Sequence, residues 1–164
     1  MDSIDKFNKL SKAEFISIFR NIFEKTEWIA ERCYESKPYN NLDELVSKML
    51  KIFENIEKER HLEILNSHPD LAVEKKLTED SKNEQKNSSL NQCTDEEFVE
   101  FKKLNEEYKK KFGFPFIIAV KEKNKEEILN SFRQRITNNI NLEFEEAKKQ
   151  VKKIATFRLD EIIK

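Results

Sequence analysis

The chain has 164 residues, a length that suits one domain with a single hydrophobic core. Its 31 basic and 32 acidic residues are interspersed and give a net charge of −1, so no run of one sign indicates a nucleic acid or an anionic membrane as partner. No apolar stretch approaches the roughly 20 residues of a membrane span, and residues 1–5 lack the basic and then apolar pattern of a signal peptide. The isolated Cys33 and Cys93 fit a reducing compartment and no metal site. We therefore expect a cytoplasmic protein.

The composition also predicts the fold class. One glycine and three prolines are too few for the tight turns of a β-sandwich or barrel, whereas 13 phenylalanines can supply a core. We expect an all-α, single-domain bundle of about eight helices over residues 1–164. In chain order, apolar periodicity and capping residues predict helices over residues 11–23, 28–34, 41–56, 59–67, a segment beginning near 78 or 81, and then 94–113, 124–138 and 141–163.

Residues 114–120 are the one strand-like run, and taken alone they fit either a short strand or a buried extended segment. Pro115 lies within this run and makes a regular strand harder to form. Backbone N–H groups in an irregular buried segment need partners, and a ligand can supply them. The run could also be simple core, and the residues alone leave both interpretations open.

A first departure from the helical pattern is His68, which ends a predicted helix and precedes Pro69. The proline restricts the backbone of the residue before it, so the histidine is held in place. An imidazole titrates near neutral pH and can give or take a proton. The alternative is a histidine that only satisfies free carbonyls at the helix end. His61, seven residues earlier in a charged helix, is expected at the surface.

The second departure is the polar segment 81–85. In a helix Ser81, Glu84 and Gln85 share one face, which presents a hydroxyl, a carboxylate and an amide together, with Lys82 and Asn83 between them. A serine followed three residues later by a glutamate is also what a plain capping box looks like. Both interpretations stay open on spacing alone.

The third departure is Arg158, which falls on the apolar stripe of the last predicted helix. An unpaired guanidinium on a buried face is costly. Arg158 therefore meets a buried carboxylate such as Glu84, points into a cavity that takes an anionic ligand, or snorkels out from the edge of the stripe.

These departures occur together in one family. The sequence resembles 2-oxo-4-hydroxy-4-carboxy-5-ureidoimidazoline (OHCU) decarboxylases over about residues 11–163. His-Pro-Asp alone is a weak motif, but five elements in order are specific. The matching elements are Trp28-Ile29-Ala30-Glu31-Arg32, His68-Pro69-Asp70-Leu71-Ala72, Ser81-Lys82-Asn83-Glu84-Gln85, the signature from Phe101 through Gly113 to Val120, and Ile154-Ala155-Thr156-Phe157-Arg158-Leu159.

The resemblance implies an all-α enzyme, usually a homodimer, that needs no metal or organic cofactor and converts OHCU to (S)-allantoin and CO₂ in urate degradation. It implies that His68 is the catalytic acid/base and that Glu84 assists it. It also implies substrate contacts from Pro69, Ser81 to Gln85, the backbone of Phe116 to Val120, and Arg158. Membrane and nucleic acid are not expected partners.

The residue types suit this chemistry. Loss of CO₂ leaves an electron pair on a carbon that adjoins a carbonyl, so the charge spreads onto oxygen as an enolate and no cofactor is needed as electron sink. Backbone N–H groups near Ile117 and Ile118, with Gln85, can stabilise that oxygen. His68 can deliver a proton to one face of the carbon, since its unperturbed pKa is near 6.5. Glu84 can orient the imidazole and favour its charged form.

Two other classes are weighed against this hypothesis. A co-chaperone J-domain also has histidine-proline-aspartate between helices, but it needs a basic helix before the motif, and residues 57–67 are mixed in charge. A catalytically inactive helical interaction module derived from the same family is the second alternative. An interaction module does not need His68, Glu84 and Arg158 in one cavity. If the chain is an enzyme, we expect these side chains to share a pocket.

Overall fold

The computed structural model describes residues 3–71, 83–85, 90, 93–121 and 123–163, and its regular elements are helices. No strand occurs among these residues, so the predicted all-α class is confirmed. Within the same ranges, no helix is long and apolar enough to cross a membrane. The helices are α1 (Ser3–Asn8), α2 (Lys12–Phe19), α3 (Glu27–Glu35), α4 (Leu42–Glu54), α5 (Lys58–Ser67), α7 (Asp95–Phe112), α8 (Lys125–Arg135) and α9 (Ile140–Ile163).

Helix starts follow the expected capping chemistry. The side chain of Asn41 accepts a hydrogen bond from the N–H of Glu44 at 2.8 Å and so caps α4. Thr94 and Glu97 form a reciprocal capping box at the start of α7, and Asn124 opens α8 in the same way. Each cap satisfies backbone donors that a helix leaves free in its first turn, which is why short sequence motifs predict these boundaries well.

The single glycine ends α7. Gly113 has φ of +80° and ψ of 10°, the left-handed conformation that terminates many helices, and its N–H bonds to the carbonyl of Lys109 at 2.8 Å. A Cβ built at this position meets no atom within 4 Å, so only the backbone conformation disfavours a side chain here.

Gly113→Ala should therefore lower the free energy of unfolding by about 1–2 kcal/mol, the cost of placing an ordinary L-residue in the left-handed region. Urea denaturation followed by circular dichroism measures this loss. Gly113→Asn is the control and should lose less, because asparagine tolerates this conformation better. Equal losses in the two variants would contradict a purely conformational cost.

Near the N-terminus the structure differs from the predicted helices at two points. α1 was not predicted, and α2 ends at Phe19 although the apolar pattern continues to Phe23. Ile22 and Phe23 are still buried, and Lys25 just after them has φ of +55°. The chain therefore leaves the helix but keeps these side chains in the core, so burial here does not imply helical backbone.

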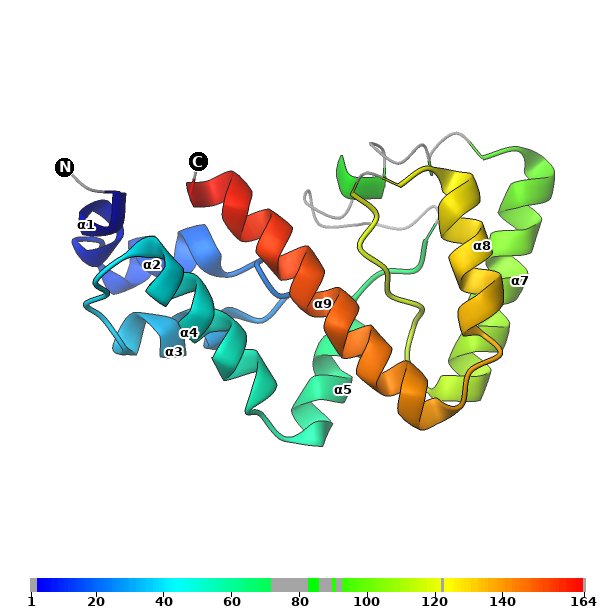
Figure 1. Ribbon diagram of the computed structural model, residues 1–164, viewed down its shortest axis with the longest axis horizontal. Coiled ribbons are helices and arrows are strands. Elements are labelled where there is room, and N and C mark those ends of the chain that lie inside the picture. Colours follow the sequence, from blue (N-terminus) through cyan, green and yellow to red (C-terminus); the bar gives the residue numbers. More distant parts are fainter. Residues whose placement is uncertain (1–2, 72–82, 86–89, 91–92, 122, 164) are drawn as a thin grey trace. The chain divides into compact units, whose positions relative to one another are not determined.

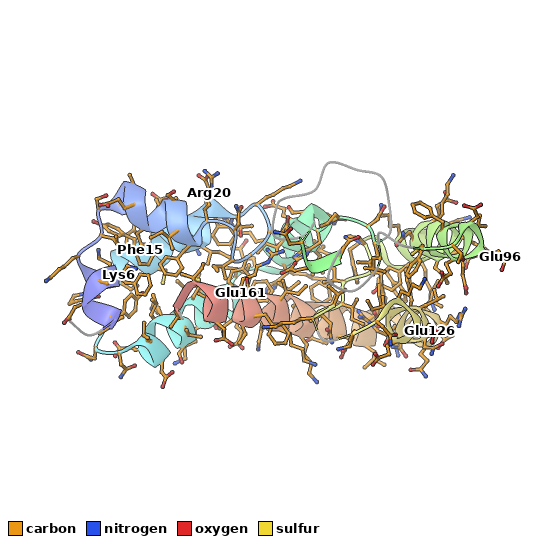
Figure 2. All side chains as sticks on the ribbon, turned by 90° about the horizontal axis from the view of Figure 1, so that it is seen from above. Lys6, Phe15, Arg20, Glu96, Glu126 and Glu161 are labelled. Carbon is orange, nitrogen blue, oxygen red and sulfur yellow. The ribbon has the colours of Figure 1, made fainter. Side chains whose placement is uncertain are left out.

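The chain divides into two compact units, the N-terminal unit (Met1–Ile64 with Lys152–Lys164) and the central unit (Leu65–Val151). The core of the N-terminal unit contains Phe15, Phe19, Phe23 and Phe53, of which the last two stack at 4.9 Å between ring centroids. On the outer side, Arg20 points away from the ribbon in Figure 2. α9 contributes its first half to the central unit and its second half to the N-terminal unit.

The prediction of a surface position for His61 is wrong. Its side chain is buried in the N-terminal unit, where Nε2 lies 2.7 Å from the carbonyl oxygen of Phe53 and the ring meets that of Phe53 edge-on. His61, Ile64 and Leu65 lie on the buried face of α5, although charged residues surround His61 in the sequence. The local charge pattern therefore concealed a helical stripe.

The central unit is built on a second aromatic cluster. Its rings come from α7, α8 and the run after Gly113, and the stacked pair Phe116 and Phe132 has a centroid distance of 3.9 Å. α7 and α8 lie side by side in Figure 1. Phe114 and Phe116 belong to this cluster, and residues 114–120 are all buried.

Candidate functional site

His68 lies where the sequence placed it, directly after the last residue of α5. Its backbone N–H bonds to the carbonyl of Leu65 at 3.2 Å, and Pro69 follows outside the helix. The side chain is only 9% exposed. The histidine is therefore held at a helix end in a largely buried environment, where a proton donor can act away from bulk water.

The segment after His68 is held from two directions. The carbonyl oxygen of Asp70 accepts a hydrogen bond from Nε2 of Gln85 at 3.2 Å, and the carbonyl oxygen of Leu71 accepts one from Nδ2 of Asn105 at 3.1 Å. One turn further along α7, Nζ of Lys109 lies 2.6 Å from Oδ2 of Asp70. Side chains distant in sequence thus fix the backbone that follows the histidine.

Part of the predicted 81–85 segment is thereby brought to the histidine motif. Residues 83–85 are helical, with Gln85 buried, Glu84 half-buried and Asn83 exposed. The contact between Gln85 and Asp70 lies two residues from His68. Ser81 and Lys82 lie outside the described residues, and so does the predicted start of this helix near residue 78 or 81.

The strand-like run is a buried extended segment, the second of the two expected conformations. Residues 115–120 form neither helix nor strand and are all buried, and the ring of Phe116 packs in the aromatic cluster of the central unit. Two side chains from helices bind its backbone. Nη1 of Arg135 donates to the carbonyl of Ile117 at 2.6 Å, and Oε1 of Gln150 accepts from the N–H of Ala119 at 3.0 Å.

These contacts decide which backbone donors of the run remain for a ligand. Within the part of the chain that the structure describes, the N–H groups of Ile117 and Ile118 donate no hydrogen bond. The N–H of Ala119 donates to Gln150, so the protein itself supplies the partner of this donor. The two adjacent donors at Ile117 and Ile118 are those that the sequence analysis favoured for an oxyanion.

A buried network behind the run was missed by the sequence analysis. Glu143 is fully buried, and its Oε1 lies 2.6 Å from Nε and Nη2 of Arg135 and 2.6 Å from the hydroxyl of Tyr108. Burial is the main cause that raises the pKa of Tyr108, so its hydroxyl stays protonated and donates to the carboxylate. Arg135 shares the apolar face of α8 with Ile128 and Phe132, the same signal that identified Arg158.

Arg158 is buried in the N-terminal unit, which rules out the snorkelling alternative. Its Nη2 lies 3.0 Å from Oε2 of Glu24, and its Nη1 donates to the carbonyl of Asn21 at 2.7 Å. Glu24 is itself 1% exposed. A buried carboxylate does meet this guanidinium, as one alternative required, but Glu24 was not singled out because it lies outside any helix, where periodicity gives no signal.

Comparisons with known proteins agree on one family. Residues 8–160 match the family model described as OHCU decarboxylase. The 2-oxo-4-hydroxy-4-carboxy-5-ureidoimidazoline decarboxylase of Haloferax volcanii is 35% identical over 97% of this chain and 95% of its own length. The uric acid degradation bifunctional protein of Bacillus sp. (strain TB-90) is 39% identical over the whole chain, which spans only 33% of that relative.

Solved structures agree in fold. The crystal structure of (S)-allantoin synthase superposes with a TM-score of 0.81 at 28% identity and covers 100% of this chain, which matches 54% of that protein. The structure of an OHCU decarboxylase in the presence of (S)-allantoin gives a TM-score of 0.75 at 23% identity over 89% of this chain and 97% of its own. At that identity the second match supports the fold alone.

Proposed function

The chain belongs to the OHCU decarboxylase family, and from that premise we propose that it converts OHCU to (S)-allantoin and CO₂ in urate degradation. The observation on which the proposal chiefly depends is His68, buried and fixed at a helix end, with Gln85 bound to the segment that follows it. A largely buried histidine near a polar amide suits proton transfer to a carbanion better than it suits a solvent-exposed binding surface.

The reaction breaks the bond between the ring carbon and its carboxylate. In OHCU the carbon that loses CO₂ carries the hydroxyl group and adjoins a ring C=N bond rather than a carbonyl. The electron pair therefore moves into the ring through this C=N bond and onto the conjugated 2-oxo oxygen, and CO₂ leaves. The N–H groups of Ile117 and Ile118 stabilise the developing charge on that oxygen. His68 then gives its proton to one face of the ring carbon that bears the ureido group, which sets the S configuration. The hydroxyl carbon becomes the carbonyl of allantoin as the hydroxyl proton passes to the ring nitrogen. Glu84 favours the charged form of the imidazole.

The remaining predicted residues belong to this proposal as binding groups. Pro69, Ser81 to Gln85 and the run Phe116 to Val120 contact the substrate, and Arg158 is an additional polar contact. We expect no metal or organic cofactor, since the conjugated ring of the substrate is its own electron sink. The resemblance also implies a homodimer, and the sequence features indicate a cytoplasmic protein; both remain predictions for this chain.

A coupled assay tests the activity. Urate is oxidised enzymatically in the presence of the hydrolase that yields OHCU, and circular dichroism follows the chiral product with and without this protein. We expect the protein to accelerate formation of (S)-allantoin, whereas the uncatalysed reaction gives a racemate with no signal. A product signal that is equally weak with the protein would favour the alternative, a catalytically inactive helical interaction module of the same family.

A further inference from the structure

A side chain from a helix binds each of two consecutive peptide units of the buried run. Arg135 of α8 binds the carbonyl oxygen of Ile117 at 2.6 Å, and Gln150 of α9 binds the N–H of Ala119 at 3.0 Å. The first contact fixes the peptide plane between Ile117 and Ile118, and the second fixes the next plane. The single N–H between these two contacts, that of Ile118, therefore has a set direction.

That direction follows from peptide geometry. In a trans peptide the C=O and N–H groups point to opposite sides of the plane. Because the carbonyl of Ile117 faces Arg135, the N–H of Ile118 faces away from it, and it donates to none of the residues that the structure describes. A cation bound to the carbonyl also draws electron density across the amide, which makes the N–H on the far side a stronger donor.

We infer that Arg135 is a positioning residue for the decarboxylation. Its guanidinium orients and polarises the N–H of Ile118 toward the substrate oxygen that becomes negative. The inference rests on the proposed function, because it assumes that the substrate lies against residues 116–120. Stronger donation matters most when charge develops on the oxygen, so Arg135 acts on the transition state more than on the bound substrate.

Only a guanidinium can perform both tasks at this position. Nε donates a hydrogen bond to Oε1 of Glu143 and Nη2 forms an ion pair with the same oxygen, while Nη1 donates to the carbonyl of Ile117. Glu143 balances the buried charge and is held in turn by Tyr108 and by Nδ2 of Asn138 at 3.1 Å. The planar group also lies over the ring of Phe116, with Cζ 4.4 Å from its centroid. A lysine is a point charge and cannot bridge two acceptors in this geometry.

Arg135→Lys is the first test. The ammonium group can still pair with Glu143, so the charge balance of the core is kept while the bond to Ile117 is lost. We expect kcat for OHCU to fall on the order of 10–100-fold, as for a weakened and misaligned oxyanion donor. KM should change much less, because the oxygen of the bound substrate is not yet charged. A kcat equal to that of the wild type in a folded variant overturns the inference.

Two further variants separate positioning from stability. The double variant Arg135→Met, Glu143→Gln removes both buried charges at once, which usually costs little stability, and it should show the same loss of kcat. Phe101→Leu opens the same aromatic core from α7 without touching the network, and it should lower the midpoint of thermal unfolding while kcat stays near that of the wild type. A loss of kcat that tracks unfolding across all three variants would refute a positioning role.

A spectroscopic readout makes the inference independent of turnover. Losing the bond at the carbonyl of Ile117 should move the amide nitrogen resonance of Ile118 upfield in Arg135→Lys, and (S)-allantoin added as a probe should shift this resonance in the wild type more than in the variant. An unchanged Ile118 resonance overturns the inference even if the enzyme is active. An inactive wild type with a displaced Ile118 resonance in the variant would instead refute the proposed function and leave the polarised amide established.

Discussion

Replacing His68 with asparagine is expected to abolish formation of (S)-allantoin while the helical circular dichroism spectrum stays unchanged. The imidazole is the proposed proton donor, and a positioned acid of this kind contributes roughly 10²–10⁴-fold to a rate. Contacts other than those of the ring hold the backbone around the position. The backbone N–H of His68 still bonds to Leu65, and Asp70 and Leu71 are still held by Gln85 and Asn105.

The other histidine supplies the matched control. His61 is also buried on α5, but its ring bonds to the carbonyl of Phe53 and takes no part in the proposed chemistry. His61→Asn should therefore lower the midpoint of thermal unfolding while kcat of the folded fraction stays close to that of the wild type. Full activity in His68→Asn would remove this residue from the mechanism, and loss of activity in both variants without unfolding would point to a different use of α5.

Replacing Arg158 with methionine should cost about 3–5 kcal/mol of folding free energy, the usual penalty for removing one partner of a buried ion pair. Glu24 is 1% exposed and would lose the guanidinium 3.0 Å away, and the carbonyl of Asn21 would lose a donor. The double variant Arg158→Met, Glu24→Gln should recover part of this loss, because a neutral amide then replaces the carboxylate that had faced the guanidinium. Urea denaturation at pH 7 measures both.

An exposed pair provides the comparison. Arg133 binds Glu100 through two short hydrogen bonds, but its side chain is 49% exposed, so Arg133→Met should cost only about 0–1 kcal/mol. The contrast isolates burial as the cause, since both arginines bind a carboxylate. Equal losses for Arg158→Met and Arg133→Met would mean that the Glu24 pair adds little to folding.

Local chemistry explains which elements the sequence predicts correctly. The caps at Asn41, Thr94 and Asn124 and the glycine after α7 act within a few residues of their own position, so short motifs are sufficient. The predicted end of α2 was wrong because Ile22 and Phe23 continue the apolar periodicity after the backbone has left the helix. Packing within the N-terminal unit determines where α2 ends, and the apolar periodicity of the sequence carries no information about that packing.

The residues of the candidate site likewise divide into those that the sequence identifies and those that only the folded chain reveals. His68 was identifiable because a histidine before a proline breaks a helical pattern, and Arg158 because a charge interrupts an apolar stripe. Arg135 interrupts the stripe of α8 in the same manner, so the rule that found Arg158 would also have found it. Glu24 and Gln150 could not be recognised as partners, since only the folded chain brings them to Arg158 and Ala119.

The most direct test of the central claim is a crystal structure of this protein with (S)-allantoin bound. We expect the product to lie with its reacting carbon near the His68 ring, at about 3–3.5 Å as proton transfer requires, and with a ring oxygen accepting from the N–H of Ile118. Product bound away from both groups, or bound with His68 facing elsewhere, would contradict the proposed mechanism.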